Sequence, residues 1–211
     1  MISPPSSDPR LTFAIYKLQD VLDEQVSDPC EDWLKIVPWK HRVLPRFQPT
    51  FDPAHLPQMT EADFFSFLRF RNNHHWDSLC RVEDHMVEDM DVLRSALLIL
   101  LDESRPIKDR LNEIRPERHW AEHSMVSHLG TPVLTAILQV MFPDKYGVWN
   151  NTSDDGLKTI KLWDKRWEKM KAGDVYIEMN TLYLQLAAAL QIDLWTLDAL
   201  WWVMKPKKRN V

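Results

Sequence analysis

Glycine is scarce in this sequence, and its scarcity disfavours two large fold classes. Only 4 of the 211 residues are glycine, against 14 prolines and 10 tryptophans. All-β chains need glycine in their tight turns, and Rossmann chains need it in their phosphate loop. Hydrophobic residues make up 45% of the chain, which is enough to bury a core. The sequence therefore predicts an all-α fold.

Cysteine, long apolar runs and a secretion signal are also lacking. The two cysteines, Cys30 and Cys80, match neither a zinc-ligand spacing nor a disulfide framework. Apolar stretches such as 96–101 and 186–190 are far shorter than the ~20 residues of a membrane span. The first residues, Met-Ile-Ser-Pro-Pro, do not have a signal-peptide profile. We expect a cytoplasmic chain with no membrane partner and no cofactor.

Positive charge is in deficit overall and collects in one stretch. The chain has 31 acidic and 26 basic residues, a net charge of −5, so any attraction for DNA must be local. Residues 158–171 carry six basic residues and two acidic ones. As one helix, this stretch would lay Lys158, Lys161 and Lys165 along DNA phosphates. The alternative is a solvated helix face.

Three regions are expected along the chain. Residues 1–57 begin with an amphipathic helix from about 9 to 26, after which six prolines break any helical period. We expect 28–57 to form an extended arm whose aromatic side chains pack on the body. Residues 58–204 would form the helical domain, and 205–211 a basic tail.

Apolar periodicity and capping residues predict a series of helices in the domain. They are expected from Thr60, over 86–101, 107–114, 118–128, 132–141, 174–190 and 193–204, and from a start at 151–155.

The helices over 118–128 and 132–141 would form a hairpin. Gly130 is expected to supply a left-handed turn between them. Backbone amides at the start of the second helix would then hold a DNA phosphate, with His128, Gly130 and Thr131 at the contact. The alternative is an ordinary turn between two helices.

The segment 142–155 gathers aromatics, amides and carboxylates in a loop and at the following helix start. Trp149 next to Asn150 suits stacking on a base and recognition of its edge. Asp154 and Asp155 are candidates for a catalytic anion. Alternatively, both aspartates complement the helix dipole behind a hydroxyl cap.

The order of these segments resembles the helix-hairpin-helix DNA glycosylase superfamily, especially its 8-oxoguanine-glycosylase-like branch. The resemblance covers roughly 115–204 and rests on Leu-Gly-Thr at 129–131, the apolar helix 133–138, Phe-Pro-Asp-Lys-Tyr at 142–146 and Val-Trp-Asn at 148–150. It implies that the hairpin grips the DNA backbone. It also implies a lysine at the start of the second hairpin helix that attacks the sugar, and an aspartate after this helix that supports loss of the base.

Both catalytic positions depart from that pattern. Pro132 stands at the lysine position and Asn150 at the aspartate position. Proline cannot form a Schiff base, so lyase activity is not expected unless Lys145 has taken over the role. Asn150 can orient a water or a base edge, but the carboxylate must then come from Asp154 or Asp155.

Further candidates for the site lie outside these segments, and Asp198 is the remaining candidate for the catalytic anion. Asp198 sits in the apolar helix 193–204, where an unpaired carboxylate is costly, so we expect it to pair or to line a cavity. The tryptophans of that helix are expected in the core, and Asp193 is expected to cap it. Trp120 and His123, just before the hairpin, would wall the base pocket. No histidine pair has enough further ligands nearby to predict a metal site.

These features favour a monofunctional DNA glycosylase that binds double-stranded DNA as a monomer. It would extrude a damaged or modified base and hydrolyse the N-glycosidic bond to leave an abasic site. By resemblance, the expected targets include modified bases in phage DNA, which would be a defence role. Two alternatives remain: a non-catalytic helix-hairpin-helix module that binds DNA or a protein, and a helical adaptor whose hairpin contacts no phosphate.

Overall fold

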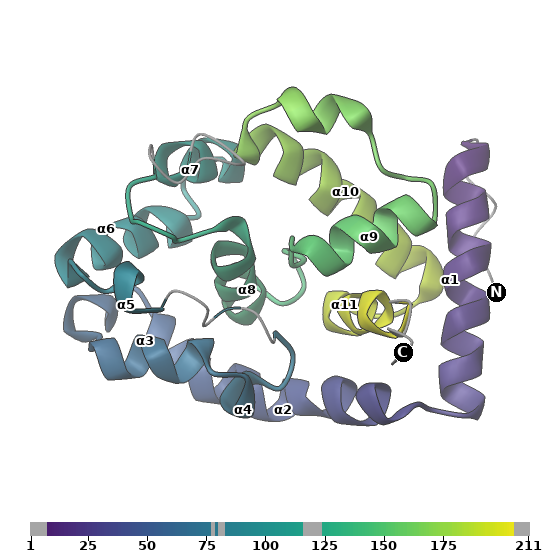
Figure 1. The fold of residues 1–211 in the computed structure, drawn as a ribbon, viewed down its shortest axis with the longest axis horizontal. Coiled ribbons are helices and arrows are strands. Elements are labelled where there is room, and N and C mark those ends of the chain that lie inside the picture. Colours follow the sequence, from purple (N-terminus) through teal and green to yellow (C-terminus); the bar gives the residue numbers. More distant parts are fainter. Residues whose placement is uncertain (1–7, 77–78, 80–82, 116–123, 205–211) are drawn as a thin grey trace, which may run out of the picture.

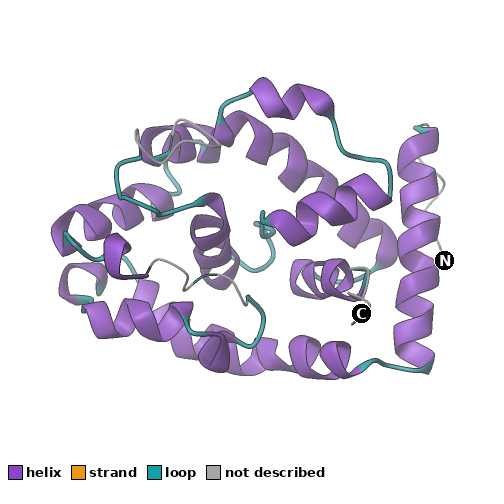
Figure 2. Ribbon diagram, viewed as in Figure 1, coloured by secondary structure: helices purple, strands orange, loops and turns teal. Residues whose placement is uncertain are grey.

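Helices make up all the regular secondary structure that the computed structural model describes, in residues 8–76, 79, 83–115 and 124–204 (Figure 2). The predicted all-α fold is confirmed for this part of the chain. None of the helices described there is both long and apolar enough to span a membrane. The basic tail and most of the predicted helix 118–128, including Trp120 and His123, lie outside the described residues.

The elements are α1 (Pro9–Ser27), α2 (Glu31–Phe51), η1 (Leu56–Gln58), α3 (Glu61–Leu68), α4 (Phe70–Asn73), α5 (Glu83–Met86), α6 (Met90–Leu101), α7 (Ile107–Ile114), α8 (Thr131–Met141), α9 (Asn151–Thr159), η3 (Lys165–Lys169), α10 (Ala172–Leu190) and α11 (Leu194–Val203). Those labelled η are 3₁₀ segments. In Figure 1, α1 stands at one end of the molecule, α3, α5 and α6 lie toward the other, and α8 lies in the middle.

The predicted N-terminal helix is confirmed as α1. The Asp8 carboxylate accepts a hydrogen bond from the backbone amide of Arg10 at 2.8 Å, and Pro9 supplies a fixed φ in the first turn. Ala14 and Leu18 are fully buried, and α1 contacts α10 and α11. The capping residue and the apolar stripe that define this helix are therefore both visible in its own sequence.

The extended arm predicted for 28–57 is wrong, because most of it forms the long helix α2. Its prolines at 38, 45 and 49 are all exposed. On the opposite side, Val43 and Phe47 are buried, and α2 contacts α8 and α11. An interior proline costs about 3 kcal/mol, and burying a large apolar side chain returns about 1.5–3 kcal/mol. The helix therefore depends on its tertiary partners.

The first helices share one hydrophobic core with the last ones. The indole Nε1 of Trp195 in α11 donates a hydrogen bond to the carbonyl oxygen of Ile36 in α2 at 3.0 Å. Lys40 of α2 forms an ion pair with Asp193 at 2.7 Å. The N-terminal region is thus part of the scaffold that supports the centre of the molecule.

The later helices follow the prediction closely. The helix predicted over 132–141 is α8, and those over 174–190 and 193–204 are α10 and α11. The cap predicted for the last helix is confirmed, because the Asp193 carboxylate accepts a hydrogen bond from the amide of Thr196 at 2.7 Å. The helix predicted over 86–101 begins later, at Met90, because Asp89 caps α6.

Candidate functional site

A cavity of about 220 Å³ lies where the N-terminal ends of α8 and α9 meet. Its lining residues are Arg115, Gly130, Thr131, Pro132, Trp149, Asn150, Asn151 and Asp154. Five of these were predicted from the sequence to bind a base, a phosphate or the reacting sugar: Gly130, Thr131, Trp149, Asn150 and Asp154. The structure therefore brings the turn before α8 and the loop before α9 together around one hollow.

The turn before α8 differs from the expectation. The left-handed residue is His128, with φ 60°, whereas Gly130 has φ −83° and an extended backbone. The amides of Val133 and Leu134 both donate to the Gly130 carbonyl at 3.1 Å. Residues 124–128 form bends and a turn rather than the end of a helix. Gly130 thus begins α8 without the left-handed conformation predicted for it.

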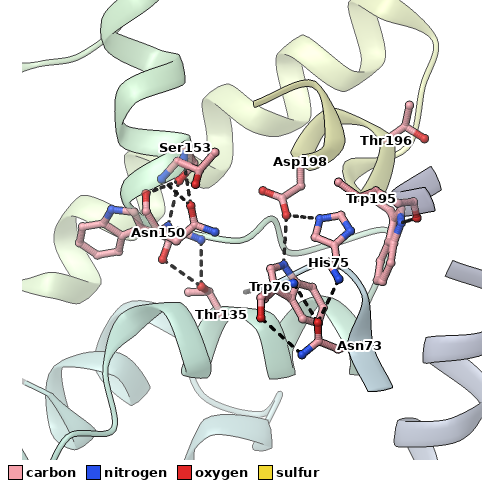
Figure 3. A network of polar contacts seen from close by, with 12 residues as sticks. Asn73, His75, Trp76, Thr135, Asn150, Ser153, Trp195, Thr196 and Asp198 are labelled. Carbon is pink, nitrogen blue, oxygen red and sulfur yellow. Dashed lines mark hydrogen bonds and ion pairs between the residues drawn. The ribbon is translucent and has the colours of Figure 1, made fainter. Parts of the chain in front are cut away.

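Thr135 ties the loop before α9 to α8. Its hydroxyl donates to the carbonyl of Thr131 at 2.7 Å and accepts the backbone amide of Trp149 at 2.9 Å. Figure 3 shows this hydroxyl next to the loop that carries Asn150. The bond to Trp149 spans the loop between the two helices, so it fixes the position at which α9 begins.

Trp149 has its indole buried, with 2% of the residue exposed. Its ring is stacked parallel to Tyr176, with 6.5 Å between the centroids. Its Nε1 donates a hydrogen bond to Oδ1 of Asp154 at 2.8 Å. In this arrangement the indole orients a carboxylate and offers no open ring face for the base stacking that the sequence predicted.

Asn150 caps α9. Its Oδ1 accepts the amides of Thr152 at 2.8 Å and Ser153 at 3.0 Å, and the Ser153 hydroxyl accepts the amide of Asn150 at 2.9 Å. This reciprocal pair is a capping box. The helix start predicted at 151–155 is confirmed, with a carboxamide as its cap instead of the expected hydroxyl.

The two neighbouring aspartates have different surroundings. Asp154 is 8% exposed and lines the cavity, in the first turn of α9, where the helix dipole stabilises a negative charge. The side chain of Asp155 is 63% exposed and pairs with Lys158 at 3.4 Å. Of these two neighbouring aspartates, only Asp154 is part of the cavity lining.

Arg115 also lines the cavity, although the sequence did not single it out. It follows α7 directly, is 9% exposed, and its Nη1 donates to the Ser124 hydroxyl at 3.1 Å. Burial lowers the pKa of Arg115 from its usual value. In the sequence, Arg115 is marked only as the first residue of the stretch 115–204 over which the resemblance extends. It brings a positive charge to a hollow that already holds a carboxylate.

Lys145 lies outside this lining. Its ammonium pairs with Glu103, which also accepts a hydrogen bond from the Tyr146 hydroxyl at 2.8 Å. The bond to Glu103 raises the pKa of Lys145 above its usual range. The Lys145 ammonium therefore lies in an ion pair with Glu103, outside the described lining of the cavity.

Asp198 lies in a second buried cluster (Figure 3). Its Oδ2 accepts hydrogen bonds from Nε2 of His75 and, at 3.1 Å, from Nε1 of Trp76. The side chains of Asn73 and Trp195 complete the cluster by bonding the His75 amide and packing on its ring. The expectation that Asp198 pairs is confirmed, and it is not among the residues that line the cavity.

The basic stretch does not form the single helix that was predicted. Helix α9 ends at Thr159, Lys161 has a left-handed φ of 61°, and Lys165 begins the short η3 segment. Lys158 and Lys161 place their ammonium groups 4.9 and 5.1 Å from the ring centroids of Trp163 and Phe13. The basic side chains are exposed and distributed over two elements and a loop, away from the cavity lining.

Comparisons of this chain with protein families, curated proteins and solved structures found no match. Within the described ranges, no three potential metal ligands come together.

Proposed function

We propose that the chain is a monofunctional DNA glycosylase whose active site is the cavity between α8 and α9. One observation carries this proposal. Pro132 and Asn150, the positions that the resemblance assigns to the catalytic lysine and aspartate, line the same cavity as the buried carboxylate of Asp154. A hollow between a hairpin helix and a buried carboxylate supports excision of a base that has left the DNA stack.

In the proposed reaction, Asp154 is the catalytic anion. Water attacks C1′ of the sugar while the bond from C1′ to the base nitrogen breaks, and the base leaves with the bonding electrons and takes up a proton. Positive charge grows on the sugar, and a fixed carboxylate stabilises it more in a poorly hydrated cavity than in water. Trp149 is a positioning residue, because its indole holds one oxygen of Asp154 at 2.8 Å.

The cavity and the hairpin have separate tasks in this proposal. A volume of about 220 Å³ is below the ~300–1,000 Å³ of drug-sized pockets, which suits one flipped base. Double-stranded DNA would lie against the turn at His128, Gly130 and Thr131, with Arg115 near the extruded nucleotide. Damaged bases and modified bases of phage DNA are the proposed substrates.

The test is excision from duplex DNA that carries a panel of damaged and modified bases. Asp154→Asn should lower the rate of abasic-site formation by about 10²-fold or more, because it removes the charge and keeps the shape. The matched control is Asp155→Asn, an exposed neighbour, which should stay within a few-fold of the wild-type rate. Equal rates for the two variants would show that Asp154 is not the catalytic anion.

A non-catalytic DNA-binding module is the second candidate, because the Asn150 carboxamide caps α9 and Pro132 offers no nucleophile. Binding of the whole panel without excision would establish it. No binding at low salt would leave the helical adaptor, since contacts to phosphate are strongest there.

A further inference from the structure

Two neighbouring parts of the fold, α2 and the corner between α3 and α4, contain stretches of sequence that are basic and free of acidic residues. Residues 33–51 and 64–76 contain six lysine and arginine residues and no aspartate or glutamate, in a chain whose net charge is −5. On α2, Trp39, Arg42 and Arg46 follow at intervals of three and four residues, which places them on one side of the helix. This concentration of positive charge lies far along the chain from the stretch at 158–171.

Side-chain contacts join α2 to the corner. The Trp39 ring is stacked on His74 with 3.5 Å between the ring centroids. The Arg42 guanidinium lies 4.9 Å from the Trp39 ring centroid, and Arg46 donates a hydrogen bond to the Ser66 hydroxyl at 3.1 Å. Helices α2, α3 and α4 also lie together along one edge of the molecule (Figure 1). Trp39 and Arg46 of α2 are therefore in direct contact with residues in α3 and at the end of α4.

Four exposed arginines in these two stretches have no carboxylate partner among the residues that the structure describes. They are Arg42 and Arg46 of α2 with Arg69 and Arg71 at the start of α4, and we call this set, together with Trp39 and His74, the arginine face. The lysines of α2 differ, because Lys35 pairs with Glu31 and Lys40 pairs with Asp193. The charge that remains uncompensated on α2 is therefore carried by arginine.

We propose that the arginine face binds the phosphodiester backbone of nucleic acid, as a second contact outside the cavity. The planar guanidinium groups match phosphate oxygens in a two-pronged geometry, which a lysine cannot do. Phe70, 44% exposed and 5.7 Å from the His74 ring, adds an aromatic surface for a base. This proposal takes from the proposed function only that the partner is a nucleic acid. Excision and the cavity play no part in binding to the arginine face.

An anionic membrane is the less favoured partner of this face. Membrane-binding surfaces insert apolar side chains between lipids. Here the half-buried Trp39 is held by His74 and covered by Arg42, which leaves Phe70 as the exposed aromatic side chain named on this face. One aromatic ring beside four arginines is not the broad apolar side of a membrane-binding helix.

The experiment measures binding of the full chain to fluorescently labelled duplex and single-stranded DNA across a salt series. The double variant Arg42→Gln, Arg71→Gln should flatten the slope of log affinity against log salt by roughly 0.9 per lost contact for duplex and 0.7 for a single strand. The control, Lys17→Gln with Lys108→Gln, removes the same charge from exposed lysines outside both basic regions, and its slope should equal that of the wild type. Unchanged melting temperatures would show that both variants fold.

The outcomes distinguish nucleic-acid binding by the arginine face from base excision in the cavity. A flattened slope in a protein that excises nothing would support the arginine face and reject excision. A slope equal to that of the wild type would overturn the arginine face, even if excision were observed. Loss of binding to vesicles of anionic phospholipid with unchanged DNA binding would also overturn it, in favour of a membrane contact.

Discussion

The indole nitrogen of Trp149 lies 2.8 Å from a carboxylate oxygen of Asp154, five residues further along the chain. This bond connects the loop before α9 to the first turn of that helix. It therefore fixes one oxygen of Asp154, the only aspartate among the described residues that line the cavity. A side chain expected to stack on a base is instead the one that orients the proposed catalytic group.

The first prediction concerns that bond. Trp149→Phe keeps an aromatic ring but removes the donor, which should lower the excision rate and cost about 1.5–3 kcal/mol of unfolding free energy, the range for a bond to a charged group. Trp167→Phe is the matched control, because its Nε1 donates to Glu178 at 2.7 Å, away from the cavity lining. Rates and urea unfolding are measured for both. Comparable loss of excision in the two variants would argue against a positioning role.

The second prediction concerns the product. With Pro132 at the lysine position and Lys145 paired to Glu103, the reaction should leave intact abasic DNA, cleaved only after alkali or heat. Borohydride should trap no covalent complex with the wild type. Pro132→Lys, which places an amine in the cavity wall, is the positive control and should yield one. Trapping by the wild type that disappears in Lys145→Ala would contradict the monofunctional mechanism.

The third prediction compares two glycines. A Cβ added to Gly156 would lie 2.4 Å from Cε3 of Trp201, so Gly156→Ala should force α9 away from α11. Overpacking costs about 1–3 kcal/mol, which outweighs the ~1 kcal/mol that alanine gains inside a helix. At Gly130 the nearest atom, Cδ of Pro132, would be 3.3 Å away and φ is −83°, so Gly130→Ala should cost less stability than Gly156→Ala. Urea unfolding measures the stability of both variants, and equal stabilities for Gly156→Ala and Gly130→Ala would contradict this packing argument.

The fourth prediction is a pH dependence at the contact between α2 and α11. Burial raises the pKa of Asp193, but the bonds from Lys40 and Thr196 outweigh it and hold this pKa below its usual value. The ion pair therefore stabilises the fold above the unfolded-state pKa of about 3.9 and is lost as the pH falls through the lower folded value.

Lys40→Met should accordingly cost about 0.2–1 kcal/mol at pH 7, as partly exposed ion pairs do. The difference from the wild type should vanish as the medium is acidified below about pH 4. Urea unfolding at several pH values measures it, with Lys17→Met as the exposed control. A difference that persists in acid would mean that lost packing, and not the charge, is responsible.

Local signals explain which helices were predictable from the sequence. For α1 and α11, a capping aspartate and an apolar stripe lie within the segment itself. For α2, the prolines predicted a break in the helix. The compensating burial of its apolar side depends on α8 and α11, which lie 80 or more residues further along the chain, as the bond from Gln48 to the Val140 carbonyl illustrates. Such a helix cannot be deduced from its own residues.

The sequence predicted which segment contains the candidate site, but not how the side chains of the site are arranged. The run of polar residues after Trp149 indicated a helix start beside a pocket, and the structure places a cavity there. Which of Asp154 and Asp155 faces inward depends on how α9 rotates against α11, where Gly156 meets Trp201. Arg115 reaches the same hollow from α7, and no spacing in the sequence relates it to the loop.

The contact between α2 and α11 has a consequence for synthesis on the ribosome. Ile36 and Trp195, whose hydrogen bond joins these helices, are 159 residues apart, which corresponds to roughly 8–32 s of translation. Throughout that interval the apolar side of α2 lacks one of its two main partners. The nascent chain therefore exposes an apolar surface to which a holding chaperone would bind. Messages truncated before α11 should yield aggregates instead of a shortened native protein.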